Sequence, residues 1–552
     1  MRRNTDILKN TVFDVLIIGG GIHGATIARE ATLRGYKTAL VEKGDFGSAT
    51  SANSLKVIHG GLRYLQHANF HRIRQSIQSR KIFQQVAPHL IDNIPFLVPT
   101  YGYGIKSKFV MNAAIKFYDV ISLDRNKNIP PENYLPGGKT ISKNEILKII
   151  PGIKTEGLTG GAVWYESISN DSERLILEFI LQAAEYGAEI FNYIKVEKLL
   201  FENNKIKGAL AIDLLTGNSF EIKADITVVA AGPWLNNFVH SPSAKFPLTK
   251  AVNIVVNKNL FGNYAVGLES AGEYEDKDAI IKRGKRLYFF VPLHGKTMIG
   301  TTYKKYSGKP DNLKITKHDI IEILDEVNKI NPEINLSFDD VCFYHTGLLP
   351  MEPLSNPDDD IQPGKHSVIF DSENENGTKG GIFIKSVKFT TAPSIAIETV
   401  NLIDKKRGKR TSAPEQNYLH KPEIIENTTK SAAIPGEYIS RIIKVYGKKR
   451  ANKIINMITG NPQWGEMISE TPPVTEAEII YNIKYEYAQK LKDIVLRRTG
   501  LGNLNIPSPV TIEKIAKILQ REFDLTQNET EHEISGTLDY YSILKSEIVN
   551  HI

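Results

Sequence analysis

Hydrophobic residues near the N-terminus follow two different spacings in quick succession. Residues 15–18 form a continuous apolar run that leads into a glycine-rich turn, a helical pattern follows, and a second apolar run ends at Glu42. Strands of a parallel sheet are buried on both faces and therefore read as continuous apolar runs. The order predicts a strand, a tight turn, a helix and a second strand, which is the start of an α/β fold.

The remaining pattern predicts groups of strands and helices. The basic side chains of the next helix, which include Arg80 and Lys81, are expected to face solvent. A strand that ends at Ala231, before Gly232, is expected to return to the first sheet, where small residues let the backbone approach a ligand. Helices are predicted at 69–85, 109–121, 172–187, 316–330 and 392–405, strands within 189–231, 245–305, 341–346 and 381–388, and loops over the rest of 86–135 and over 356–379.

The last part of the chain differs in composition. Residues 406–433 are polar and basic, and helical periodicity then returns at 439–458, 476–498 and 511–523. This change predicts a linker followed by a separate helical domain. A chain of 552 residues is too long for one hydrophobic core, so two or three domains are expected.

The composition indicates which compartment and which kinds of partner are expected for this protein. The net charge of +7 suits anionic substrates or an anionic membrane surface, and it does not indicate nucleic-acid binding. The single cysteine, Cys342, excludes an internal disulfide and fits a reducing cytosol. We see no run of ~20 apolar residues that would span a membrane and no spacing that suggests a metal site.

The glycine-rich turn carries the clearest chemical signal. Gly19, Gly21 and Gly24 have the G-x-G-x-x-G spacing. These glycines permit a sharp turn, close approach to a pyrophosphate and tight packing of the helix on the strand. Glu42 lies close to where the acid that binds an adenosine ribose is expected, ~20 residues further on. The unit therefore predicts a dinucleotide site.

The stretch after this unit resembles a known family. Residues 44–65, GDFGSATSANSLKVIHGGLRYL, resemble the FAD-dependent glycerol-3-phosphate dehydrogenases and oxidases. Further motifs fit that family in the same order: APHL at 87–90, AAGPW at 230–234, GTT at 300–302, KFTT at 388–391 and the helical segment 476–502. The resemblance covers nearly the whole chain. It implies a Rossmann-like FAD-binding domain interleaved with a mixed or antiparallel-sheet substrate domain, followed by a C-terminal all-α domain.

The resemblance also implies domain boundaries. An FAD-dependent oxidoreductase region covers 1–405, a linker 406–433 and the helical domain 434–552. Within the first region, FAD-binding segments are expected at about 11–90, 155–235 and 380–405, and substrate-domain segments at about 91–154 and 236–379.

The family oxidises sn-glycerol 3-phosphate to dihydroxyacetone phosphate and passes the electrons through FAD to a membrane quinone or to oxygen. Such a reaction needs a proton acceptor and positive charge beside an anionic substrate. His59 is either that acceptor or a simple flavin contact, Arg63 matches a phosphate-binding arginine, and Lys388 could stabilise negative charge.

The resemblance thus assigns catalysis to His59, Arg63 and Lys388, and substrate contacts to Arg63, Tyr64, Lys388 and Thr391. It assigns FAD contacts to Gly19, Gly21, Ile22, His23, Gly24, Glu42, Lys43, Ser51, Ser54, Lys56, His59, Gly60, Gly61, Ala231, Gly232, Lys388 and Thr390.

The substrate half departs from the family pattern. Leu349 stands where the family has an arginine, and Lys365 is the nearest substitute for a second arginine. Tyr303 replaces an aspartate, and Ala392 and Pro393 replace a Tyr-Arg pair. Charge-assisted hydrogen bonds contribute ~1.5–3 kcal/mol each, so the loss of two arginines would weaken phosphate binding.

Three functional hypotheses remain open at this point. The chain is an FAD enzyme that oxidises glycerol 3-phosphate, an FAD enzyme for another polyol, hydroxy acid or amine, or a non-catalytic flavoprotein. A cytoplasmic protein is expected, and family analogy adds peripheral attachment to the inner face of the cell membrane. The basic run at 405–410 is interpreted as solvated linker.

Overall fold

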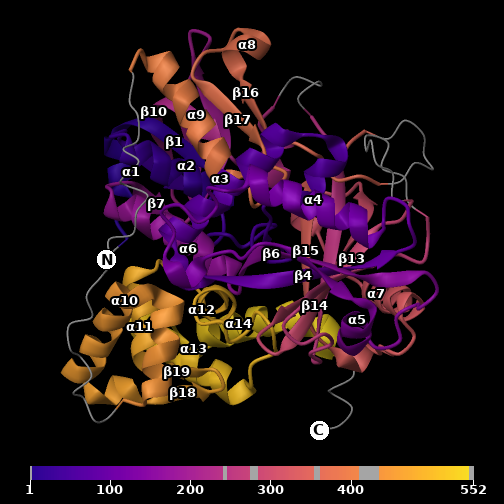
Figure 1. The fold of residues 1–552 in the computed structure, drawn as a ribbon. Helices are drawn as coiled ribbons and strands as arrows, with labels where there is room; N and C mark the ends of the chain where they lie inside the picture. The colour runs from indigo at the N-terminus through magenta and orange to yellow at the C-terminus, as the bar shows by residue number, and fades with distance from the viewer. Residues whose placement is uncertain (1–2, 240–244, 274–283, 354–360, 410–433, 546–552) are drawn as a thin grey trace.

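The computed structural model describes residues 3–239, 245–273, 284–353, 361–409 and 434–545. Two sheets lie side by side in it, and the helices of the C-terminal part pack beneath them in the view of Figure 1. Within the described residues, no helix combines the length and the apolar character needed to cross a bilayer.

The first sheet has the N-terminal strand near its centre. β1 lies parallel to β2 and β10, and β10 lies parallel to β17, so distant parts of the chain supply the central strands. The predicted return of the strand before Gly232 is therefore confirmed. The order is β16-β17-β10-β1-β2-β7, with β8 and β9 joined through β10. The bounds are β1 Val12–Ile18, β2 Thr38–Val41, β7 Glu189–Phe191, β8 Ile194–Glu202, β9 Lys205–Asp213, β10 Ser219–Val229, β16 Val368–Asp371 and β17 Gly381–Lys385.

Both faces of this sheet are buried, which explains the continuous apolar run of β1. Val15 and Ile17 pack with residues of α2, α6 and α9, whereas Leu16 and Ile18 belong to a second hydrophobic cluster on the opposite face. The three helices on the first face are α2 Ile22–Leu33, α6 Ser172–Glu185 and α9 Ala392–Arg407.

The second sheet is antiparallel except where β12 meets β4. Its order is β15-β11-β14-β13-β12-β4-β6-β3, and β5 pairs with β6. The bounds are β3 Val57–Ile58, β4 Ile91–Tyr101, β5 Lys139–Ser142, β6 Leu158–Ser169, β11 Leu248–Val256, β12 Ala265–Glu269, β13 Leu287–Leu293, β14 Lys296–Tyr306 and β15 Val341–Pro350. β6 belongs to this sheet and ends at Ser169, whereas the second predicted FAD-binding segment begins at about residue 155.

The prediction of loops over 86–135 was wrong for β4. Pro95 and Pro99 lack the amide proton of a strand ladder, so the sequence argued against a strand. β12 pairs only with Phe96 and Leu97, and neither proline interrupts that ladder. The prediction of a loop over 356–379 was also wrong in part, because β16 and the short helix α8 (Ser372–Asn376) lie within it. The remaining helices of this region are α1 Asp6–Asn10, α3 Phe70–Val86, α4 Lys108–Ile121, α5 Lys143–Ile149 and α7 Lys317–Ile330.

The C-terminal unit, residues 434–545, is mainly helical. Its helices are α10 Gly436–Gly460, α11 Glu476–Tyr485, α12 Leu491–Arg497, α13 Pro509–Phe523, α14 Gln527–Leu538 and α15 Ser542–Lys545, with a small hairpin of β18 Met467–Glu470 and β19 Pro473–Thr475. The single helix predicted over 476–498 is two helices, because Tyr487 between them has a left-handed φ of 59°.

The predicted linker begins inside helix α9, which ends at Arg407. Lys406 pairs with Asp371, and Arg407 pairs with Asp14, so this part of the basic run is a packed helix end rather than a solvated linker. The rest of the predicted linker, residues 410–433, lies outside the described residues.

Candidate active site

A cavity of about 1690 Å³ lies between the two sheets. Ligand pockets in proteins usually measure ~300–1,000 Å³, so this one has room for a large cofactor together with a small substrate. The turn after β1, the loop formed by residues 44–55 (the 44–55 loop) and the segment 386–391 line it from the side of the first sheet. Strands β11, β14 and β15 line it from the other side.

The glycine turn has the geometry that the motif requires. Gly19 has a φ of +111°, and a side chain there would collide with the carbonyl group of Ala230. A Cβ on Gly21 would lie 3.0 Å from the hydroxyl of Ser51, across the turn. Gly24 faces the backbone of Gly19, and a Cβ would not fit between them. Gly19 and Gly21 therefore line the cavity, while Gly24 allows α2 to pack on β1 and does not reach the cavity wall.

Acceptor groups surround this turn. Glu42 accepts hydrogen bonds from the amides of Gly20 at 2.6 Å and Gly44 at 2.8 Å. Burial raises the pKa of Glu42, against the lowering effect of these two amides. Ser51 accepts a hydrogen bond from the Ile22 amide at 3.1 Å. The loop of Ser51 and the first turn of α2 are thus joined directly.

His23 provides a test of whether a cofactor fits here. Its side chain lines the cavity and is 5% exposed, and its Nε2 has no hydrogen-bond partner among the described residues. Burial lowers its pKa to about 4, so the ring is neutral at pH 7. A buried polar atom without a partner, beside a turn free of side chains, fits a polar group such as the diphosphate of a dinucleotide.

Other predicted cofactor contacts also line the cavity: Ile22, Lys43, Ser54, His59, Gly61, Ala231, Gly232 and Thr390. Lys43 stands at the wall with its ammonium 2.5 Å from Asp311 and 3.6 Å from the centre of the Trp234 ring. Gly60 does not line the cavity; its neighbours on either side do.

The side chain of Lys56, a predicted cofactor contact, does not reach the cavity. Its side chain is buried below the loop, and Nζ lies 2.7 Å from each carboxylate oxygen of Glu173 and 2.9 Å from the hydroxyl of Ser172. Lys56 has a left-handed φ of 64°, and it is absent from the cavity wall. The lysine therefore joins the loop to α6.

The expectation that Arg80 and Lys81 face solvent was also wrong. Arg80 is 1% exposed and lies 2.9 Å from Glu166 on β6. The same carboxylate accepts a hydrogen bond from the amide of Gly60. Because Gly60 follows His59, this buried ion pair fixes the backbone that carries the predicted catalytic histidine.

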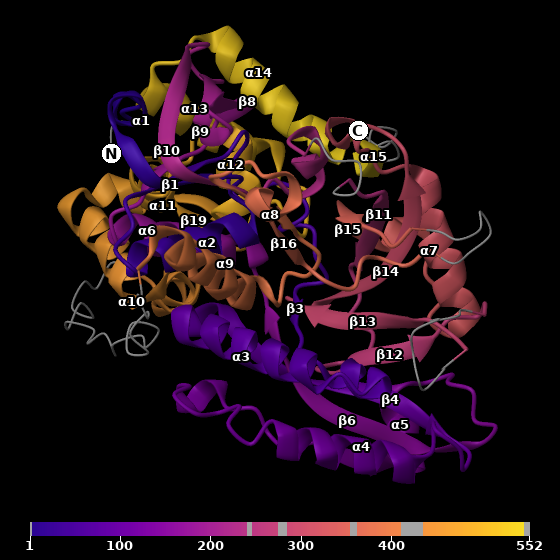
Figure 2. The ribbon, with the colours of Figure 1, turned by 90° about the horizontal axis from the view of Figure 1, so that it is seen from above.

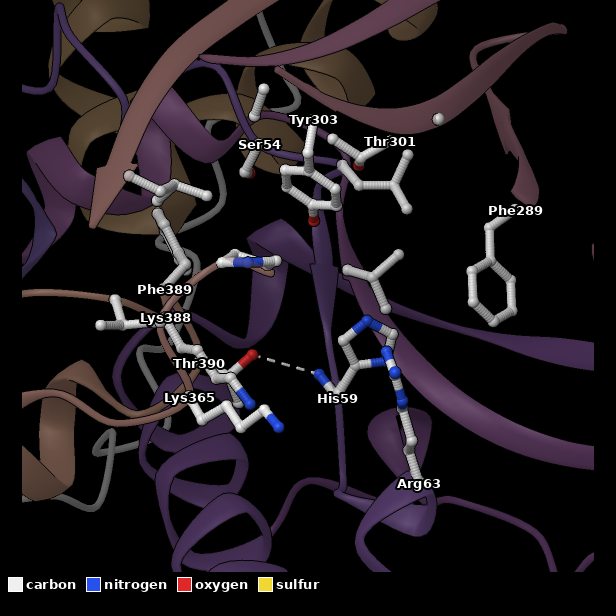
Figure 3. A pocket seen from close by; sticks show the side chains of 18 of the residues that line it. Ser54, His59, Arg63, Phe289, Thr301, Tyr303, Lys365, Lys388, Phe389 and Thr390 are labelled. Atoms are coloured by element: carbon white, nitrogen blue, oxygen red, sulfur yellow. Dashed lines mark hydrogen bonds between the residues drawn. The ribbon is translucent and has the colours of Figure 1, made fainter. Parts of the chain in front are cut away.

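His59, Lys388 and Arg63 approach the same part of the cavity (Figure 3). The amide of His59 donates to the hydroxyl of Thr390 at 3.3 Å, the dashed line of Figure 3. Desolvation, followed by the positive charges of Lys388, Arg63 and Arg80, lowers the pKa of His59 to about 4. His59 is therefore neutral at pH 7 and able to accept a proton.

Lys388 is held by Tyr64. Its ammonium donates to the Tyr64 hydroxyl and lies 4.4 Å from the centre of that ring. Burial lowers the pKa of Lys388, and the charges of Arg72 and Arg63 act in the same direction. The backbone carbonyl of Lys388 accepts a hydrogen bond from Thr391 at 3.3 Å.

The departures from the family pattern divide into two groups. Leu349, Lys365 and Tyr303 line the cavity, whereas Ala392 and Pro393 are buried at the start of α9, away from its wall. Arg286, which no sequence motif indicated, also lines the cavity and lies 5.6 Å from the centre of the Tyr303 ring.

One end of the cavity is apolar and open. Phe70, Ile105, Val110 and Phe117 line it and are at the same time exposed to solvent. They adjoin further exposed apolar residues on and after α4, of which Phe109 is 83% exposed. Figure 2 shows α3 and α4 at one edge of the molecule.

Comparison with known proteins places this site in a family. The family of FAD dependent oxidoreductases matches residues 14–396, and the C-terminal domain of alpha-glycerophosphate oxidase matches residues 415–530. A glycerol-3-phosphate dehydrogenase of Synechocystis sp. is 31% identical over 525 residues, which cover 91% of each chain. The chain belongs to the FAD-dependent glycerol-3-phosphate dehydrogenase and oxidase family.

Another relative and a solved structure are also similar to this chain. An alpha-glycerophosphate oxidase of Streptococcus pneumoniae is 35% identical over 378 residues, 67% of this chain and 59% of that one. The fold is similar to that of the glycerol-3-phosphate dehydrogenase from Bacillus halodurans complexed with FAD, with a TM-score of 0.72, 24% identity and coverage of 98% and 95%.

Membership in this family makes the protein an FAD-dependent oxidoreductase with FAD as its cofactor. The third hypothesis, a non-catalytic flavoprotein, is therefore dropped. The predicted fold class, an FAD-binding α/β region with a second sheet and a C-terminal helical part, is confirmed.

Proposed function

We propose that the enzyme oxidises the secondary alcohol of sn-glycerol 3-phosphate to the ketone of dihydroxyacetone phosphate. The observation that carries this proposal is the neutral His59 beside the cationic Lys388 and Arg63 on one wall of the cavity. FAD, when bound, would supply the two-electron oxidant that accepts a hydride from the substrate carbon. A nitrogen of the His59 ring accepts the proton of the substrate hydroxyl.

The charge of the substrate has a role in this step. Arg63 and Lys388 attract a phosphate, and Lys365 and Arg286 add positive charge to the same cavity. The cations that lower the pKa of His59 are partly neutralised when the anion arrives. The histidine therefore becomes a stronger base in the complex, when its proton acceptance is needed.

Anaerobic reduction tests this proposal. The enzyme loaded with FAD is mixed with glycerol 3-phosphate in the absence of oxygen, and the absorbance of oxidised flavin is followed. We expect rapid bleaching, and at least a hundredfold slower bleaching for His59→Asn, in line with the ~10²–10⁴-fold contribution of a general base. No bleaching at millimolar substrate would reject glycerol 3-phosphate.

A second candidate is another polyol, a hydroxy acid or an amine. Leu349 and Tyr303 on the cavity wall favour it, because leucine has neither the charge nor the hydrogen-bond donors of arginine, and tyrosine lacks the negative charge of aspartate. The same assay with unphosphorylated polyols, hydroxy acids and amines distinguishes the two candidates. If Leu349→Arg alone produced full activity on glycerol 3-phosphate, the second candidate would lose its main support.

We further propose that electrons leave to a lipophilic quinone in a membrane with which the α4 edge associates peripherally. The support is the apolar opening of the cavity at Phe70, Ile105 and Phe117. Exposed apolar side chains on an amphipathic helix insert into the interfacial region of a bilayer.

Sedimentation with anionic liposomes tests this surface. Wild type should sediment, and Phe109→Glu combined with Leu123→Glu should remain in the supernatant. Val510→Glu, at an exposed apolar residue of the C-terminal unit, is the matched control and should sediment like wild type. Equal recovery of all three in the supernatant at low salt would reject membrane association and leave oxygen or a soluble acceptor.

A further inference from the structure

The C-terminal unit contacts the FAD-binding loop through buried charges. Asp45, in the 44–55 loop, is 2% exposed. Arg497 donates to it at 2.6 Å, and Arg498 donates to both of its carboxylate oxygens at 2.8 Å. Burial alone would raise the pKa of Asp45, but Arg498 and Arg497 hold it well below its usual range, so this carboxylate stays charged.

A second contact lies next to the first. The ring of Phe46 meets the ring of Tyr487 edge-on, with 5.8 Å between their centres. Asn192 donates to Asp45 at 3.1 Å and to the carbonyl oxygen of Tyr487 at 2.8 Å. The junction between α11 and α12 is therefore seated directly on the start of the 44–55 loop.

The 44–55 loop in turn contacts the glycine turn after β1, so contacts that hold the loop also hold the turn. A Cβ on Gly20 would lie 2.7 Å from the Phe46 ring, so the ring packs against the turn itself. The amide of Gly47 donates to the carbonyl oxygen of Gly20 at 3.0 Å, and Ser51 accepts from the Ile22 amide. The distance along the chain from Asp45 to these contacts is only one to six residues.

We propose that Asp45, Arg497 and Arg498 are positioning residues, through which the C-terminal unit holds the 44–55 loop in its FAD-binding geometry. FAD binding and docking of the C-terminal unit therefore stabilise each other. Such a coupling is reciprocal: if docking of the C-terminal unit strengthens FAD binding by some factor, FAD binding strengthens docking of the unit by the same factor. This inference depends on FAD as the cofactor and is independent of the substrate.

A second ion pair serves as a control, because it can show whether any loss of contact with the C-terminal unit changes FAD affinity or only loss of the contact with the 44–55 loop. Arg450 on α10 and the buried Glu178 on α6 also form an ion pair between the C-terminal unit and the rest of the chain. Neither residue lines the cavity or belongs to the 44–55 loop. Loss of this pair removes one contact of the unit, while the contacts of Arg497 and Arg498 with Asp45 still hold the loop.

The first experiment compares FAD affinity in three variants. The dissociation constant of FAD is measured by flavin fluorescence for wild type, Arg498→Gln, Arg498→Lys and Arg450→Gln, together with the melting temperature of each. We expect Arg498→Gln to raise the dissociation constant at least tenfold and Arg498→Lys, which keeps the charge, to restore much of the affinity. Arg450→Gln should lower the melting temperature but change the dissociation constant less than twofold. Equal changes in FAD affinity for both glutamine variants, or none for Arg498→Gln, would overturn the proposal.

The second experiment needs no variant that might fail to fold. Amide hydrogen exchange is measured on the wild-type chain with and without FAD. FAD should slow exchange in α12, Leu491–Arg497, more than in α14, Gln527–Leu538, which belongs to the same unit. Equal protection of both helices, or protection of neither, would contradict the proposed coupling.

Discussion

Arg80 of α3 and Glu166 of β6 form an ion pair at 2.9 Å in which both side chains are almost completely buried. Glu166 also accepts hydrogen bonds from the amide of Gly60 and from the indole of Trp164. A buried charge without its partner is unstable, so the pair keeps the backbone after His59 in one place. The consequences of this arrangement are testable.

Replacing Arg80 with methionine should destabilise the protein strongly. The change leaves Glu166 buried without a cation, which costs ~3–5 kcal/mol. The free energy of unfolding in urea measures this. The control is Arg74→Met, which breaks the partly exposed pair with Asp124 and should cost about 1 kcal/mol or less. Similar losses for both variants would contradict the role of the buried pair.

Gly60→Ala should impair folding and activity, because the new methyl group would collide with the Tyr118 hydroxyl and the Arg80 guanidinium. Overpacking of this kind typically costs ~1–3 kcal/mol. Adding Tyr118→Phe removes one of the two collisions and should recover part of the loss in melting temperature. Gly104→Ala, where the space around the Cβ is open, should behave like wild type.

His23 should contribute a loss of stability to the protein without FAD as the pH falls from about 6.5 to about 4. The pKa of His23 is lowered to about 4 by burial, so in this window the unfolded chain binds a proton that the folded chain does not. The free energy of unfolding then falls with falling pH by up to ~1.4 kcal/mol per pH unit for one group. His59, whose pKa is also lowered, acts in the same direction but less strongly, because its side chain is exposed to solvent in the cavity.

Urea denaturation at several pH values separates the two histidines. His23→Asn should reduce the pH dependence by about the share of one group, and His532→Asn, at an exposed residue, should leave it unchanged. A slope in His23→Asn as steep as that of wild type would show that the ring is not held neutral by burial.

Lys388→Met should reduce kcat/KM for glycerol 3-phosphate by ~10²-fold or more, the usual effect of removing one stabilising group from a developing charge. Steady-state rates with an artificial electron acceptor measure this. Lys388→Arg keeps the charge and should be less damaging, and Lys385→Met, three residues earlier, serves as the control. Loss of activity in Lys385→Met alone would place the essential cation on β17 instead.

The cofactor half of the site was predictable because its residues are close together in the chain. The apolar run, the glycine spacing and Glu42 all fall within thirty-one residues, from 12 to 42, and local sequence determines their geometry. The burial of Arg80 was not predictable, because its partner Glu166 is 86 positions away. The contact of Arg498 with Asp45, separated by 453 positions, left no local pattern at all.

Errors in the second sheet have a different physical cause. Pro95 and Pro99 made β4 resemble a loop, although they lie outside the short β12 ladder. Arg286 could not be assigned to the cavity, because an isolated arginine before a strand is more often solvated than functional. Where a residue acts through tertiary contacts alone, its own neighbours in the sequence are uninformative.

The position of β10 between β1 and β17 has a consequence for synthesis on the ribosome. β1 leaves the ribosome more than 200 residues before β10 is complete, and the segment 386–391 of the cavity wall follows later still. During this interval FAD cannot stabilise the nascent chain, because the cavity is incomplete. The apolar strand β1 also lacks its neighbour β10. Such long-range pairing makes folding slow, so production of this protein should depend on chaperones and benefit from lowered growth temperature.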